Sequence, residues 1–234
     1  MRGLNYLSVI GLVLMTMGCV QKAGHEFVRP DPERLLLGKT TKQEVLASYG
    51  EPQSRKNFTT FETQQGADTR ISDFDSANAP GSYSVLTYAY VESNPRITGG
   101  AIDSKRTNFS FFDDVLIGYS FVSSFANTST DFSEAKIGQL QKGTMSKADV
   151  VALLGKPDGE MMFPGVKNIG DSTFFYGFHK LDTSGGQILN KSLVILFDQA
   201  SHIKDVRFAS NSEPWAPAVG SSGGVPVFIP VPKK

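Results

Sequence analysis

The chain has 234 residues, of which 40% are hydrophobic and 20% are charged, a composition typical of a folded protein with one large domain or two small ones. Lysine plus arginine and aspartate plus glutamate number 23 each, so no net charge would attract the chain to nucleic acid or to an anionic surface. A single cysteine excludes an internal disulfide and a cysteine-rich zinc site.

The first twenty residues predict export. Arg2 is the only early charge, an apolar run extends from Leu7 to Met17, and a glycine precedes Cys19. A basic start, a short apolar core and a small residue before a cleavage point are typical of a secretory signal peptide, here residues 1–18. The apolar run is shorter than the ~20 residues that cross a bilayer. A permanent membrane helix over residues 3–20 is the alternative.

The Gly18-Cys19 pair at the end of this segment resembles the bacterial lipobox, in which the cysteine is acylated and the preceding bond is then cut. Thr16 and Met17 stand where such sites usually carry Leu and then Ala or Ser. The resemblance implies a palmitate-type lipid anchor at Cys19, with each acyl chain contributing about 0.8 kcal/mol per buried CH₂. Val20 after the cysteine, rather than Asp, implies outer-membrane delivery. A cysteine incidental to a plain signal is the alternative.

An internal repeat organises the rest of the chain. Residues 38–52 parallel residues 143–157 without a gap, so that Gly38 matches Gly143 and Pro52 matches Pro157, each pair 105 positions apart. Each copy contains the signals of a short amphipathic helix. A hydroxyl residue is followed three positions later by an acid, an arrangement close to a capping box, and a glycine and a proline close the segment. The paired signals are Thr41 and Glu44, Ser146 and Asp149, and the closing glycines Gly50 and Gly155.

Strand patterns follow each helix in the same order. Tyr83 to Val91 alternates, with Leu86, Tyr88 and Tyr90 on one face, and Phe174, Tyr176 and Phe178 repeat that aromatic face. Two hairpins follow: residues 107–112 with 116–122 through Asp113-Asp114, and residues 191–197 with 203–208 through the turn 198–202. Shorter helices are predicted to begin near Asp31 and Ser133.

The predicted fold class is α+β, with two tandem ααβββ units, each a small antiparallel sheet covered on one face by two short helices. The predicted division is a signal peptide (1–18), a lipidated linker (19–30), a first unit (31–125) with a polar insertion (54–81), a second unit (131–210) and a tail rich in Pro and Gly (211–234).

The motif KGTMSKADVVALLGKP at 142–157, followed by FFYGF at 174–178 and LVILFD at 193–198, resembles the SmpA/OmlA (BamE-like) family of outer-membrane lipoproteins. The first copy matches less closely, with Tyr49 in place of the usual Leu. The tandem pair also looks like the β-lactamase inhibitor protein fold. Both resemblances imply a non-catalytic binding module without a cofactor, and the first implies a role in outer-membrane assembly or maintenance.

Residue patterns for catalysis or metal binding give no coherent site. Residues 220–224 match a G-x-S-x-G elbow around Ser222, but a Pro-rich tail follows where that motif needs a helix. His25, His179 and His202 lack metal-ligand spacing, and Asp113, Asp114 and Asp198 are explained as turn formers. We therefore expect no enzyme, no metal and no cofactor.

One strand predicts an interaction surface. If Val194 and Leu196 face the core, then Leu193, Ile195 and Phe197 project from the opposite face and need a cover. The other repeat is one cover, and a partner protein is the other. The expected function is thus a lipid-anchored protein on the periplasmic face of the outer membrane that binds an envelope protein. The alternative is an inhibitor or ligand-binding protein of the β-lactamase-inhibitor type, and an enzyme is a third, weaker class.

Overall fold

The computed structural model describes residues 21–58, 77, 79–94, 101–182 and 186–214. The predicted signal peptide, Cys19, Ser222 and most of the insertion lie outside this part. The elements, in chain order, are β1 (Gln21–Gly24), α1 (Lys42–Tyr49), β2 (Ser54–Phe58), β3 (Tyr83–Asn94), β4 (Ala101–Phe112), β5 (Val115–Ser123), the 3₁₀ helix η2 (Glu134–Gln139), α2 (Lys147–Leu154), β6 (Gly159–Met162), β7 (Ser172–Asp182), β8 (Gln187–Phe197) and β9 (Ile203–Pro214). No helix within the described ranges is long and apolar enough to cross a membrane.

Of the four predicted helices, the two at the repeated motif form as α-helices with the predicted caps, the one near Ser133 is the 3₁₀ helix η2, and the segment near Asp31 forms turns. Thr41 accepts a hydrogen bond from the Glu44 backbone N–H while the Glu44 carboxylate accepts from the Thr41 N–H, which completes a capping box. Ser146 and Asp149 make the same pair of bonds at α2. Both helices end at a glycine with a positive φ angle, 73° at Gly50 and 91° at Gly155, which a residue without a Cβ adopts readily.

The predicted fold class is wrong, because strands dominate and the two repeats share one sheet. All the described strands belong to a nine-stranded antiparallel sheet in the order β1-β3-β4-β5-β6-β7-β8-β9, with β2 also on β3. Each repeat contributes one α-helix and four strands rather than two helices and three strands, and β1 is the ninth strand. The additional strands are β2 and β6, which lie in segments interpreted from sequence as loops, and β6 joins the repeats by pairing with both β5 and β7.

Two of the three core clusters lie between the sheet and the helices, and the third lies on the opposite face of the sheet. In the first repeat Val45 of α1 packs in one apolar cluster with Leu86, Tyr88, Tyr90 and Phe109, as the alternation of β3 predicts. In the second repeat Val150 of α2 occupies the same place above Phe174 and Tyr176. Both valines are fully buried. The predicted aromatic faces are therefore confirmed.

The segment interpreted as a linker belongs to the fold. Residues 21–24 form β1 on the edge of β3, and Phe27 is buried in the first core. Phe27 lies 105 positions before Phe132, which packs on the second core, so the repeat begins earlier than the helix motif. At the other end, β9 extends to Pro214 and pairs there with Gln187, so the first residues of the predicted tail belong to the sheet.

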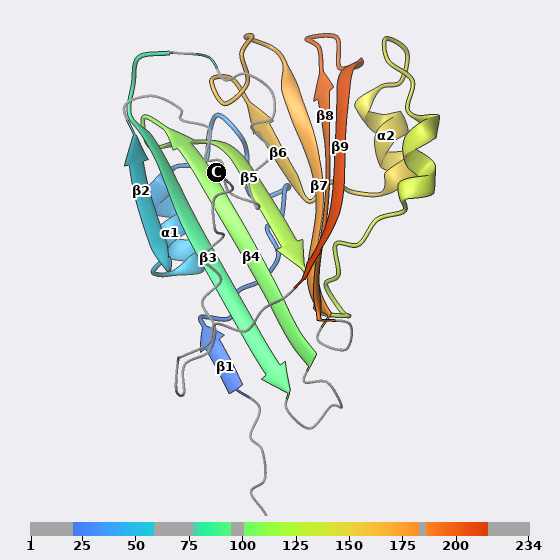
Figure 1. Ribbon diagram of the computed structural model, residues 1–234. Helices are drawn as coiled ribbons and strands as arrows, with labels where there is room; N and C mark the ends of the chain where they lie inside the picture. The colour runs from blue at the N-terminus through green and yellow to red at the C-terminus, as the bar shows by residue number, and fades with distance from the viewer. Residues whose placement is uncertain (1–20, 59–76, 78, 95–100, 183–185, 215–234) are drawn as a thin grey trace, which may run out of the picture.

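The sheet bends between the repeats. In Figure 1, β3 to β5 are seen nearly flat while β7 to β9 are seen nearly edge-on, with α1 behind the first group and α2 beyond the second. The two helices thus cover the outer side of the bend. The opposite faces of the two strand groups lie on the inner side of the bend, where Met161, Val166, Phe175, Val194 and Leu196 pack together.

Candidate functional site

The sheet face opposite α1 and α2, which we call the helix-free face, is the candidate site. Side chains alternate between the faces of a strand, so the neighbours of the core residues point to it. Many of them are small or polar, although Phe175, Val194 and Leu196 of the same face pack in a third apolar cluster with Met161 and Val166. On β3, β4 and β5 they include Thr87, Asn108 and Ser120, and on β7, β8 and β9 they include Gly177, His179, Asn190, Ser192, Ala209 and Asn211.

A polar row crosses the first half of this face. The Thr87 hydroxyl donates to the Asn108 Oδ1 at 2.8 Å, and the Asn108 Nδ2 donates to the Ser120 hydroxyl at 3.4 Å. Thr87, Asn108 and Ser120 are direct cross-strand partners in the register, so the row is set by strand pairing. Asn108 and Ser120 are buried, and their hydrogen bonds offset the cost of removing them from water.

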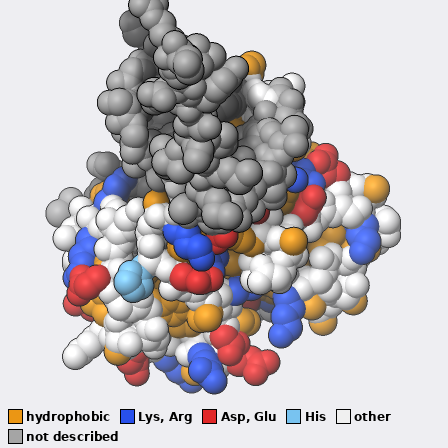
Figure 2. Space-filling model, turned by 90° about the horizontal axis from the view of Figure 1, so that it is seen from below, with side chains coloured by type: hydrophobic (Ala, Val, Ile, Leu, Met, Phe, Trp, Pro, Cys, Tyr) orange, Lys and Arg blue, Asp and Glu red, His pale blue; other side chains and the backbone are white. Residues whose placement is uncertain are grey.

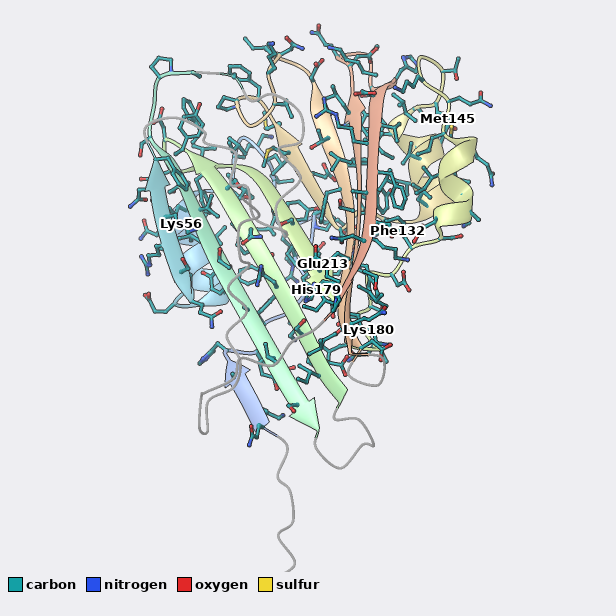
Figure 3. The ribbon with its side chains drawn as sticks, viewed as in Figure 1. Lys56, Phe132, Met145, His179, Lys180 and Glu213 are labelled. Atoms are coloured by element: carbon teal, nitrogen blue, oxygen red, sulfur yellow. The ribbon has the colours of Figure 1, made fainter. Side chains whose placement is uncertain are left out.

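A small cavity lies in the second half of the face. Its walls come from β5, β7, β8 and β9, and its volume is about 40 Å³, enough for a few water-sized groups or the end of one side chain. Gly177, Ser192 and Ala209 leave this room because their side chains are small, and His179 and Asn190 supply polar atoms at its rim. Figure 3 labels His179 on β7 near the lower end of that strand.

His179 is held as a hydrogen-bonded, largely buried imidazole. Its Nδ1–H donates to the Asn190 Oδ1 at 2.6 Å. Burial lowers the pKa of His179 below its ordinary value, the bond to Asn190 opposes this, and the positive charge of Arg106 lowers the pKa further. The imidazole is therefore neutral at neutral pH and serves as a hydrogen-bonding group rather than a positive charge.

An ion pair ties the segment before α1 to the second repeat. Arg29 Nη2 lies 2.6 Å from Asp158 Oδ1, and Asp158 Oδ2 accepts from the backbone N–H of Gly177 at 3.2 Å. The guanidinium also lies over the ring of Phe121 at 5.5 Å. Burial raises the pKa of Asp158 to about 7, and the charge and hydrogen bonds of Arg29 and the Gly177 amide act in the opposite direction. This contact bridges the junction of the repeats.

The predicted interaction surface is wrong. Leu193, Ile195 and Phe197 are fully buried beneath α2, in the cluster that contains Val150. Val194 and Leu196 point to the other face, where they pack with Met161, Val166 and Phe175. The cover that the apolar strand needed is therefore the second repeat's own helix on one side and its own β6–β7 segment on the other.

The other residues weighed from sequence occupy turns or separate positions. Asp113 and Asp114 have φ angles of 47° and 63° in the β4–β5 turn, and Asp198 accepts from the His202 N–H in the β8–β9 turn. These are the roles that the sequence indicated for them. Within the described ranges no three His, Cys, Asp or Glu side chains come close enough together to hold a metal ion.

Sequence reasoning missed two equivalent lysines that cap the two cores. Lys105 lies over the rings of Phe27, Tyr90 and Phe125 at 5.3 to 5.8 Å and pairs with Glu26. Lys191 lies over Phe132 and Phe178 and pairs with Asp131 and Glu134. The repeat could have indicated these lysines, because their contacts Glu26-Phe27 and Asp131-Phe132 are also 105 positions apart.

Comparison with known proteins leaves this chain without an assigned family. No protein-family model matches it, so the resemblance to the SmpA/OmlA family has no support there, and no curated protein matches its sequence. Among solved structures, a Streptococcus mutans protein described as a candidate β-lactamase inhibitor protein is similar, with 11% identity, a TM-score of 0.37, and coverage of 78% of this chain and 89% of that one. This likeness is too distant to assign a function.

Proposed function

We propose that this chain is a lipid-anchored protein on the periplasmic face of the outer membrane that binds another envelope protein without catalysis. The anchor follows from the signal peptide pattern that ends at Cys19. The observation that carries the binding role is the helix-free face, where polar groups of both repeats lie on one face of a single sheet that bends between the repeats. The SmpA/OmlA resemblance supports a place in outer-membrane assembly or maintenance.

The chemistry of the helix-free face suits recognition of a protein. Its exposed polar groups, such as Asn211 on β9, can donate and accept hydrogen bonds, and the cavity beside Ser192 can accept the tip of one partner side chain. A polar surface with a small apolar-floored cavity is typical of an interface core with a hydrogen-bonding rim.

Site-specific photo-crosslinking in intact cells tests this role. A photoreactive amino acid would replace Asn211 or Ser192 on the helix-free face and, as matched controls, Ala148 or Ala152 on the exposed side of α2. We expect one envelope protein to be captured from the helix-free positions and not from α2, and the purified protein to bind it again. Equal capture from both faces would contradict the proposal.

One observation favours a second candidate, an inhibitor of the β-lactamase-inhibitor type. A single sheet that spans both repeats gives one continuous surface, which can contact more of an enzyme's surface than two separate small sheets would. Addition of the purified protein to a panel of periplasmic hydrolases tests this. Inhibition that is lost in Ser192→Arg and kept in Ala148→Arg would support it, and unchanged rates across the panel would exclude it for those enzymes.

A further inference from the structure

Strand β1 enters the sheet two residues after Cys19. It begins at Gln21 opposite Ser93, where β3 is ending, and runs to Gly24 opposite Tyr90. The chain that precedes Gln21 therefore leaves the sheet at the end where β3 finishes. Two residues span at most about 7 Å, so a group that holds Cys19 also holds this end of the sheet close by.

A series of cross-strand pairs connects this end of β1 with β9 at the other edge of the sheet. Gln21 pairs with Ser93, Ser93 with Ile102, Ile102 with Leu181, Leu181 with Ile188, and Ile188 with Glu213. We call these six residues the anchor row. Since neighbouring strands lie about 4.8 Å apart, the row is about 24 Å wide. Figure 3 labels Lys180 and Glu213, which mark its β7 and β9 side.

The contacts of β1 and the residues after it make this junction firm. Lys22 lies 3.5 Å from Glu92 across the β1–β3 pair. A Cβ on Gly24 would lie 2.1 Å from the backbone oxygen of Ala89, so the strands approach closely there. Phe27 is buried against Tyr88 and Phe121. The segment between the predicted lipid and the core is therefore a structured part of the domain and not a flexible linker.

Positive and negative side chains are mixed at this end of the sheet, so its net electrostatic potential is weak. Figure 2 views the molecule from this side and shows Lys and Arg side chains interspersed with Asp and Glu side chains. Lys22 pairs with Glu92, and the exposed Lys180 and Glu213 have opposite charges. Electrostatic attraction to anionic lipid is therefore weak, and any approach of this end to a bilayer depends on the short tether.

We infer that the anchor row faces the phospholipid headgroups and that the sheet stands on this end, with the β8–β9 turn around Ala200 directed away from the bilayer. This inference rests on the proposed lipidation of Cys19. The eleven residues of β8 span roughly 35 Å, so the two ends of the β8–β9 hairpin lie at clearly different heights. The helix-free face then extends along the bilayer normal, accessible to a partner that projects from the same membrane.

Quenching of fluorescence by labelled lipid tests the orientation. The mature full-length protein would be reconstituted into phosphatidylethanolamine–phosphatidylglycerol vesicles that contain a headgroup quencher. Lipidation consumes the one native thiol, so Lys180→Cys at the anchor end and Ala200→Cys at the far turn each carry a unique dye. We expect several-fold stronger quenching at position 180 than at position 200, with little change at high salt.

A lengthened tether is the matched control. Twenty Gly and Ser residues inserted between Val20 and Gln21 would give a flexible connection of about 25 Å and should bring the quenching ratio close to one. Equal quenching at positions 180 and 200 in a protein whose lipid is verified by mass would overturn the orientation and leave the anchor standing. An unmodified Cys19 in the mass spectrum would overturn the anchor and the orientation together.

Discussion

In both repeats a tyrosine of the second strand after the helix donates to the carbonyl oxygen of the glycine that ends the helix, Tyr88 to Gly50 at 2.8 Å and Tyr176 to Gly155 at 2.9 Å. The last strand of each repeat also makes the same contact, since Leu116 of β5 and Ile203 of β9 each donate a backbone N–H to the segment before the helix. Contacts shared by the repeats thus build each unit.

Contacts that differ between the repeats join the units. Gln53 and Asp158 occupy equivalent positions, and each donates its backbone N–H to the strand after it, to Thr87 and Phe175. Gln53 is exposed at the edge of the sheet, whereas Asp158 is buried at the junction and holds Arg29. The strands that follow differ in the same way, because among the described strands β2 pairs with β3 alone, while β6 lies between β5 and β7. The contacts that the repeats share therefore stabilise each unit, and the contacts that differ join the two units into one sheet.

The largest effect is expected from the core aromatics at equivalent positions. Phe111→Ala and Phe197→Ala each remove a fully buried ring, and each should lower the free energy of unfolding by about 3–5 kcal/mol. Because one sheet joins the repeats, chemical denaturation should show one transition in both variants. Two separate transitions would show that the repeats unfold independently and would break the comparison.

A smaller effect concerns pH and distinguishes Asp158 from Gln53. The raised pKa of Asp158, about 7, means that the folded protein binds more protons than the unfolded chain between the unfolded pKa and this value. The free energy of unfolding should therefore fall as pH rises from about 4 to about 7, by at most about 1.4 kcal/mol per pH unit. Asp158→Gln should remove this slope.

The control for that titration is Gln53→Asp, which places a carboxyl at the exposed equivalent position and should add no such slope. Urea denaturation at several pH values measures both variants. A wild-type stability that rises between pH 4 and 7, with the rise abolished by Asp158→Gln, would show that Arg29 outweighs burial in setting the pKa of Asp158.

Replacement of either core-capping lysine by methionine should lower the free energy of unfolding by about 1–2 kcal/mol, because methionine keeps the apolar stem and removes the charge. Lys191→Met should cost more than Lys105→Met, because Lys191 has two carboxylate partners and also donates to the Phe132 carbonyl oxygen at 3.1 Å. Thermal unfolding at low and high salt measures the difference. A larger loss of stability in Lys105→Met than in Lys191→Met would contradict this ranking.

The smallest effect belongs to the paired tyrosines. Tyr88→Phe and Tyr176→Phe each remove one part-buried hydrogen bond to a helix-ending glycine and should each cost about 1 kcal/mol. The two losses should add in the double variant, because the sites share no partner. Unequal losses measured by denaturation would show that the shared contact has different strengths in the two repeats.

Local signals made the helices and hairpins predictable. Thr41 with Glu44 and Ser146 with Asp149 specify where each helix starts, and Gly50 and Gly155 specify where it ends. The alternation in β3 and β7 likewise placed Tyr88 and Tyr176 on the core side.

Features set by distant contacts could not be predicted from the same signals. The pairing of β5 with β6 makes one sheet of two repeats, and four residues of β6 give too short a pattern to show it. The face of β8 was assigned wrongly through a slip of one residue. Ile195 and Phe197 are the equivalents of Phe109 and Phe111, and a slip of one position moves every side chain to the opposite face.

The helix-free face was not predicted as the candidate site because its polar row and its cavity are built mostly from small or polar residues scattered over six strands. Thr87, Asn108 and Ser120 come from separate segments, and only the register brings them into one hydrogen-bonded row. The apolar run of β8 gave the stronger sequence signal, but it marks the core.

Binding of the captured envelope protein to matched charge variants tests the central claim most directly. Ser192→Arg places a long charged side chain at the cavity of the helix-free face, and Ala148→Arg adds the same charge on the exposed side of α2. Calorimetric titration should show that Ser192→Arg weakens binding at least tenfold, about 1.4 kcal/mol, while Ala148→Arg binds as the wild type does. Binding that is unchanged in Ser192→Arg but lost in Ala148→Arg would place the partner on the helices and contradict the account.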